Sequence, residues 1–142
     1  MFPLHKERGT GIAGNVATTL TTKDSQSLRL VYGQINLTTD ATVADRRVVL
    51  SAKDEDGNIM IDLHSGATVP ASQTTQHHEF MQGIYRETSF IGNALQVPIP
   101  YDFIIPANYS ISIAVENGQA GDSYNYSFMM AIEETTPGQA VI

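Results

Sequence analysis

The sequence predicts an all-β fold, a jelly-roll-like antiparallel β-sandwich, on three observations. Apolar and polar residues alternate with a period of two in several segments, as in strands with one buried face. Apolar spacings of three and four, which would indicate amphipathic helices, are nearly absent. Clusters of Gly, Asn and Asp separate the alternating segments and are typical of the turns between strands.

The first 24 residues are predicted to form an extended N-terminal arm. Residues 1–24 contain Gly9, Gly11 and Gly14 and alternate weakly, although residues 16–22 could add one edge strand. Few of these side chains are core candidates, so burial would offset little of the backbone entropy lost on ordering them. We therefore expect the arm to become ordered only against a neighbouring protein surface.

The central residues 25–134 are predicted to form the sandwich. In the first strand, residues 28–39, the apolar residues change parity near Gly33, as they do at a β-bulge. Residues 46–64 then predict a hairpin that turns at residues 54–58, where an Asp-Gly pair supplies the positive φ such a turn needs.

The later strands alternate most clearly. Residues 109–115 and 123–133 are predicted to form a second hairpin, and Met129 alone breaks the alternation of the last strand. Residues 78–84 are a candidate strand. Residues 97–106 contain three prolines and are predicted to be an edge strand or an extended connector, because proline lacks a ladder donor.

One core is sufficient for a chain of this length, 142 residues of which 42% are hydrophobic. The side chains predicted to line it share parity within consecutive strands. They are Val48, Leu50, Ile59, Ile61, Leu63, Ile111, Ile113, Val115, Tyr124, Tyr126, Phe128 and Met130. Residues 135–142, which include a Pro-Gly pair, are expected to form a short C-terminal tail.

Composition excludes several classes of partner. The formal net charge is −7, and Arg46-Arg47 is the largest basic cluster, so we expect no nucleic-acid contact. No apolar run approaches the roughly 20 residues that cross a bilayer, so we expect no membrane partner. The absence of cysteine removes disulfides and thiolate chemistry, and stability must come from burial or assembly.

The strongest metal-like cluster comprises Asp62, His64, His77, His78 and Glu79. Adjacent His77 and His78 must point to opposite faces of any strand, and the sequence has no His-x-His or His-x-x-x-His pair. We therefore predict no metal site and no cofactor, and a cupin-like metal enzyme is the weakest of the functions considered.

Other short motifs fail in context. Residues 9–14 match Gly-x-Gly-x-x-Gly in spacing, but neither a buried strand before them nor a helix after them is expected. Residues 54–58 imitate the start of a calcium loop without its later Gly and Glu, and residues 117–122 are favoured as a turn over a calcium site. No Gly-x-Ser-x-Gly elbow occurs, so we predict no catalytic residues and no enzyme.

Three segments carry a resemblance to a known class. Residues 97–113 place a Pro-Ala-Asn-Tyr turn before an alternating strand, residues 118–122 form a Gly-rich turn ending in Asp, and residues 46–58 form the central hairpin. Over about residues 28–134 this pattern resembles small β-sandwich virion structural proteins of tailed bacteriophages. Asn108 stands where that class usually has Gly, and Asn also tolerates positive φ.

The resemblance implies a capsid decoration (cement) protein. Such a protein would be made in the host cytoplasm, lie on the capsid surface of the virion, and bind the major capsid protein and itself, as a trimer or dimer. A neck or tail structural component and a glycan-binding jelly-roll module remain alternatives.

Overall fold

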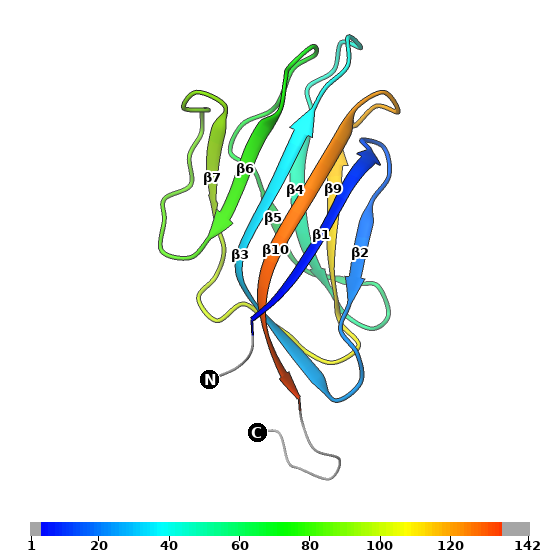
Figure 1. The fold of residues 1–142 in the computed structure, drawn as a ribbon, viewed down its shortest axis with the longest axis vertical. Helices are drawn as coiled ribbons and strands as arrows, with labels where there is room; N and C mark the ends of the chain where they lie inside the picture. Colours follow the sequence, from blue (N-terminus) through cyan, green and yellow to red (C-terminus); the bar gives the residue numbers. More distant parts are fainter. Residues whose placement is uncertain (1–3, 135–142) are drawn as a thin grey trace.

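The structure is a computed structural model that describes residues 4–134, and within them it forms ten strands and no helix. Two sheets pack face to face (Figure 1). The strands are β1 (Leu4–Ala13), β2 (Thr18–Thr21), β3 (Gln26–Thr38), β4 (Arg47–Lys53), β5 (Ile59–His64), β6 (Gln76–Met81), β7 (Ala94–Pro98), β8 (Ile104–Ile105), β9 (Ser110–Glu116) and β10 (Ser123–Glu134).

Four antiparallel pairs are nested along the chain: β1 with β10, β2 with β9, β3 with β6, and β4 with β5. The chain is thus one long two-stranded ribbon wrapped around a core, and successive pairs fall in alternate sheets. A six-stranded sheet has the order β1-β10-β3-β6-β7, with β8 also paired to β3, and a four-stranded sheet has the order β2-β9-β4-β5. This nesting is the jelly roll, so the predicted fold class is confirmed.

The hairpin predicted from residues 109–115 and 123–133 is wrong. Both strands exist, but β9 belongs to the four-stranded sheet and β10 to the six-stranded sheet. The turn between them therefore crosses from one sheet to the other. Alternation shows which face of a strand is buried, but it does not identify the neighbouring strand.

The expectation of a free arm over residues 1–24 is also wrong for the part that the structure describes. Residues 4–13 form β1 and pair with β10 from Leu4 to Ala13, and β2 supplies the edge strand expected within residues 16–22. Most β1 side chains are exposed or half-buried, so backbone pairing rather than core burial holds this strand. The predicted tail, residues 135–142, lies outside the described residues.

Eight of the twelve predicted core side chains are buried, and Ile61, Leu63 and Val115 pack against them half-buried. Ile59 is the exception, with 57% of its surface exposed. The register shifts between Ala52, which pairs with Ile61, and Lys53, which pairs with Ile59. This bulge takes Ile59 out of the alternation that predicted it to face inward.

The predicted bulge in the first long strand is confirmed, two residues before Gly33. Met129 pairs with Tyr32 and the next residue of β10 pairs with Leu30, which leaves Val31 as the extra residue. Gly33 has a different role. A Cβ there would lie 2.6 Å from the Phe128 ring, so only glycine leaves room for that ring.

A buried ion-pair network closes the end of the sandwich at the top of Figure 1, where the 117–122 turn lies. Arg46 is fully buried and donates to both Asp122 oxygens, at 2.9 and 3.0 Å, to Asp40 at 2.8 Å and to the Ala44 carbonyl at 2.7 Å. Burial alone would raise the pKa of Asp122, but bonds from Arg46 and from two backbone amides outweigh it and lower that pKa. We call this region the closed end.

Candidate interaction surface

The five residues of the metal-like cluster lie in three places. Asp62 and His64 are on β5 of the four-stranded sheet, His77 and Glu79 face outward from β6, and His78 points into the core. Within residues 4–134, no three His, Asp or Glu side chains are close enough together to hold a metal ion.

His78 is a histidine of the core. Its Nδ1 lies 3.2 Å from the Ile35 carbonyl, its Nε2 has no partner, and its ring meets Phe90 edge to face at 5.4 Å. Nδ1 is therefore the atom that carries the proton and donates it to the carbonyl. Burial lowers the pKa of His78 to about 4, because a charged ring there would lose its water.

The outer face of the six-stranded sheet has an apolar half. Strand register places Met129, Tyr32, Met81 and Pro98 side by side in one row across β10, β3, β6 and β7. The bulge residue Val31 and Ile104 of β8 extend this row toward the end where β10 stops. We call this set the apolar patch: Val31, Tyr32, Met81, Pro98, Ile104 and Met129.

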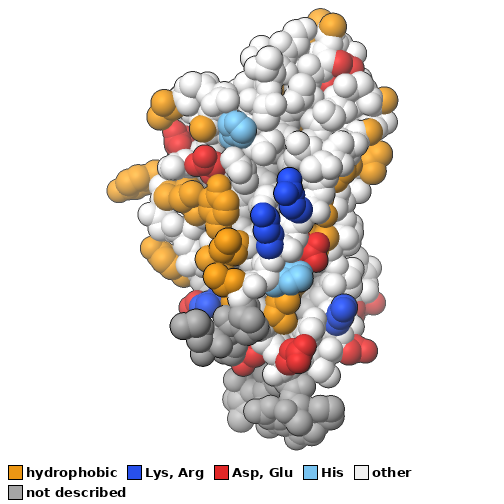
Figure 2. All heavy atoms as spheres, viewed as in Figure 1, with side chains coloured by type: hydrophobic (Ala, Val, Ile, Leu, Met, Phe, Trp, Pro, Cys, Tyr) orange, Lys and Arg blue, Asp and Glu red, His pale blue; other side chains and the backbone are white. Residues whose placement is uncertain are grey.

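The apolar patch is accessible to a partner. Met129 is 40% exposed, Val31 37% and Ile104 53%, while the other three members are half-buried. Figure 2 shows hydrophobic side chains gathered on one side of this face, beside two Lys or Arg side chains near its middle. Contiguous apolar surface on a folded domain marks sites of protein contact more often than scattered apolar residues do.

The other half of the same face is polar. The next row places Arg8, Ser127, Gln34, Glu79 and Gln96 side by side. The row beyond it contains two asparagines and His77, whose Nδ1 lies 2.5 Å from Asn36 Oδ1. The apolar patch is thus bounded on one side by a polar row that has amides, a hydroxyl and one charge of each sign, which resembles the polar rim of a protein interface.

Charges near the patch balance, although the whole chain carries −7. Three cations (Lys6, Arg8, Arg29) and three carboxylates (Glu79, Asp102, Glu133) lie on or beside this face, a sum of zero. The acidic excess must therefore lie elsewhere on the molecule. A second acidic protein can approach this face with less repulsion than it would meet on the others.

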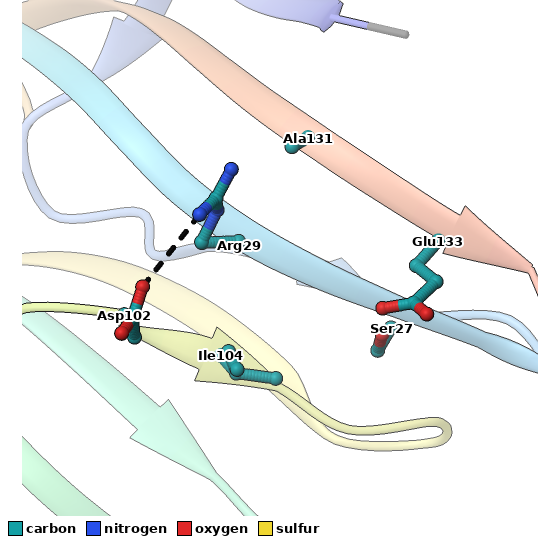
Figure 3. Close-up of a pocket in the computed structure, with 6 residues that line it drawn as sticks. All are labelled: Ser27, Arg29, Asp102, Ile104, Ala131 and Glu133. Carbon is teal, nitrogen blue, oxygen red and sulfur yellow. Dashed lines mark ion pairs between the residues drawn. The ribbon is translucent and has the colours of Figure 1, made fainter. Parts of the chain in front are cut away.

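Beside the patch is a shallow cavity of ≈ 130 Å³ (Figure 3). Arg29 points across it toward Asp102, with 3.6 Å between their charged groups, and Ile104 forms part of its wall. Small-molecule sites usually enclose about 300 to 1,000 Å³. The cavity is therefore better suited to one side chain of a partner than to a substrate.

The outer face of the four-stranded sheet is different. Its central row is Thr19, Ser112, Ser51 and Asp62, and the Ser51 hydroxyl donates to the Asp62 carboxylate. Its exposed large apolar side chains, Ile59 and Met60, lie at the start of β5. The central row of this face is hydroxyl-rich, and its register gives no apolar row across the four strands.

Sequence reasoning identified no binding residues, yet one signal was present. Met129 alone breaks the alternation of residues 123–133, and it is the β10 member of the apolar row, next to Tyr32. Tyr32 and Met81 could not be assigned to the same row without knowing that β3 lies between β10 and β6. No helix formed by the described residues is long and apolar enough to span a bilayer.

No protein-family model matches the sequence, and no curated protein sequence matches it. Two solved structures of infectious bursal disease virus align with the chain at a TM-score of 0.35. The Gt-strain chain is 16% identical over 92% of this chain, and the Gx-strain chain 14% identical over 96%. This chain spans 30% and 36% of their respective lengths, about a third of each.

Proposed function

We propose that the protein is a structural component of a virion, a decoration or cement protein that binds the outside of an assembled capsid shell. The apolar patch on the six-stranded sheet carries this proposal. Covering the exposed apolar side chains of the patch with another protein lowers the free energy of the complex. The balanced charge around the patch also reduces the repulsion that an acidic partner would meet. The partners proposed are the major capsid protein and further copies of this chain, as a trimer or dimer.

Two further observations support a structural role. The jelly roll is used by viral capsid domains, by lectins and by cupins, and the interior here is filled by aliphatic and aromatic side chains. A cupin would instead need ligands gathered around a metal. The sequence pattern of residues 28–134, which resembles phage virion proteins, favours the capsid class over the other two.

Binding to purified shells tests the proposal. The shells are assembled from the major capsid protein of the same virus, and we expect this protein to bind them. The substitution Met129→Asp should weaken that binding at least about tenfold, because it places a charge in the contact. Met60→Asp is the matched control, because Met60 is 60% exposed on the opposite sheet. Equal binding by parent and Met129→Asp, or no binding by either, would refute this role for the patch.

A glycan-binding module is the second candidate, because Tyr85 and Tyr101 are 92% and 74% exposed. Aromatic rings exposed in loops can stack on sugars, as the apolar body of tyrosine allows. A glycan array with the parent and with Tyr85→Ser distinguishes the two functions. Glycan binding that is lost in Tyr85→Ser and kept in Met129→Asp would favour the glycan module.

A further inference from the structure

A polar hollow of ≈ 290 Å³ lies on the outer face of the six-stranded sheet, over β1, β10 and β3. Its cationic residues are Lys6 and Arg8 of β1, which are exposed and share one face of the strand. Strand register pairs Lys6 with Met129 and Arg8 with Ser127. Lys6 therefore extends the row of the apolar patch onto β1, and the hollow adjoins the patch.

The two cations are unpaired in the part of the chain that the structure describes. Neither side chain forms an ion pair or a hydrogen bond there. Glu7 lies between them along β1, but it faces the other side of the strand and pairs with His5 at 3.0 Å. The carboxylate in the row of Arg8 belongs to Glu79, three strands away, or about 14 Å. An anion placed between the two cations would therefore reduce their mutual repulsion.

Amide donors lie beside the cations. Gly11, within the bulge of β1, has a φ of 65° and donates its backbone N–H to Asn125 Oδ1 at 2.9 Å. Asn36 Oδ1 lies 2.5 Å from His77 Nδ1. Both asparagines line the hollow, and their amide nitrogens have no partner among the described residues. The hollow therefore offers donors to a group that only accepts hydrogen bonds, as an ionised carboxylate does.

We propose that this hollow binds an Asp or Glu side chain of the major capsid protein that covers the apolar patch, an inference that rests on the proposed function. One carboxylate can accept from both cations, because residues two apart in a strand lie about 7 Å from each other on the same face. Lys6 is adjacent to Met129, so the partner's carboxylate should lie within about 10 Å of the residue that contacts Met129. The patch supplies apolar contact, and the hollow sets the orientation of the partner on the sheet.

An acidic sugar fits the hollow less well than an acidic side chain does. Among the described residues that line the hollow, the aromatic one is Tyr126, which is 8% exposed and faces the core. A sugar would therefore lack an exposed ring on which to stack. The continuity of the hollow with the apolar patch also favours one protein partner that covers both.

Arg8→Gln tests the inference in the shell-binding measurement. The substitution removes the charge, and because Arg8 is exposed, the urea midpoint of the free protein should not change. The dissociation rate from the shells should rise at least about tenfold while the association rate changes less than about threefold, because a seated ion pair acts mainly on dissociation. Lys23→Gln is the matched control. It changes the net charge equally, but Lys23 is exposed after β2 and lines a different hollow, so both rates should stay within about threefold.

A charge exchange identifies the partner's residue. Arg8→Glu should weaken binding more than Arg8→Gln does, because it places two carboxylates together. Replacing the Asp and Glu residues on the outer surface of the capsid protein by Arg, one at a time, should reveal one position that restores the binding of Arg8→Glu at least about tenfold. Failure of every such exchange would overturn the inference.

The other outcomes separate this inference from the proposed function. If Met129→Asp weakens binding and Arg8→Gln does not, the proposed function stands and the carboxylate site is wrong. A change in the association rate alone would also overturn the site, because it would show long-range steering without a seated pair. Acidic sugars that bind the parent but not Arg8→Gln on a glycan array would assign the hollow to a saccharide instead. No binding of the parent to shells would refute the proposed function and the site together.

Discussion

Two arginines at opposite ends of the sandwich have opposite environments. Arg46, at the closed end, is fully buried and pairs with Asp122 and Asp40 at 2.8 to 2.9 Å. Arg29, at the end where β10 stops, has a side chain 44% exposed and one ion pair, 3.6 Å from Asp102. The same residue type thus fixes loops at one end and remains available to solvent and partners at the other.

The two ends therefore differ in rigidity and in exposed apolar surface. The closed end joins the 39–46 and 117–122 loops through buried charge, so its geometry is set before any partner binds. The other end, which we call the open end, exposes Ile104, Tyr101 and Leu4 at 53%, 74% and 62%. Binding surfaces placed away from the closed end can change without unfolding the sandwich.

Phe128 lies in the core between the two ends, and its replacement should have the largest effect on the free energy of unfolding. Phe128 is 1% exposed and packs over Gly33, so Phe128→Ala should lower the free energy of unfolding by about 3 to 5 kcal/mol. The adjacent Met129→Ala, on the exposed side of the same strand, should change it by no more than about 0.5 kcal/mol. Urea denaturation measures both, and equal effects would show that the inward and outward faces are misassigned.

Asp122→Asn tests the closed end directly. The substitution keeps the shape of the side chain but leaves the buried Arg46 facing an amide donor, with Asp40 as its remaining carboxylate. We expect a loss of about 3 kcal/mol, because a buried charge that loses its partner retains its desolvation cost. A loss below about 1 kcal/mol in urea denaturation would mean that this network does not hold the loops.

Lowering the pH should reduce the free energy of unfolding in two stages, through His78 in the core and then through Asp122 at the closed end. The pKa of His78 is lowered from its unfolded value of 6.5 to about 4, so the unfolded chain binds the extra proton first and stability falls between pH 6.5 and about 4. The full loss is about 3 kcal/mol. The lowered pKa of Asp122 has the same sign, but that contribution is present above the unfolded pKa and is lost only below about pH 4.

His78→Leu separates the two stages. This variant should keep a nearly constant free energy of unfolding from pH 6.5 to about 4.5, while the parent loses stability over that range. Denaturant melts at half-unit pH steps measure the difference. If parent and variant follow the same curve, the buried imidazole is not the group that titrates.

The inward faces of the strands could be predicted from the sequence, but the strand neighbours could not. Alternation correctly placed Tyr124, Phe128 and Ile111 in the core, because side-chain period depends only on local backbone geometry. It failed for β1, whose partner β10 lies at the other end of the chain. It also failed at the 117–122 turn, because a turn of this length can reverse within a sheet or cross between sheets.

The buried charges were hidden for a related reason. Arg46 belongs to a basic pair that is typical of a surface, and Asp122 closes a turn, where aspartate is common. Only the meeting of the two loops makes them partners. The apolar patch was equally hidden, apart from Met129, because its members come from strands separated by many residues.

Asp102→Asn should have the smallest effect, and it completes the comparison of the two ends. The substitution matches Asp122→Asn in chemistry, and asparagine tolerates the positive φ of 51° at this position. Because the Arg29–Asp102 pair is 3.6 Å apart and largely exposed, water already screens it, and its loss should change the free energy of unfolding by less than about 0.5 kcal/mol. Raising the salt concentration should shrink even this difference, whereas the effect of Asp122→Asn should persist because the closed end excludes solvent ions. Urea melts of both variants at low and high salt measure the contrast, and a large, salt-insensitive loss for Asp102→Asn would show that the open end is held as firmly as the closed one.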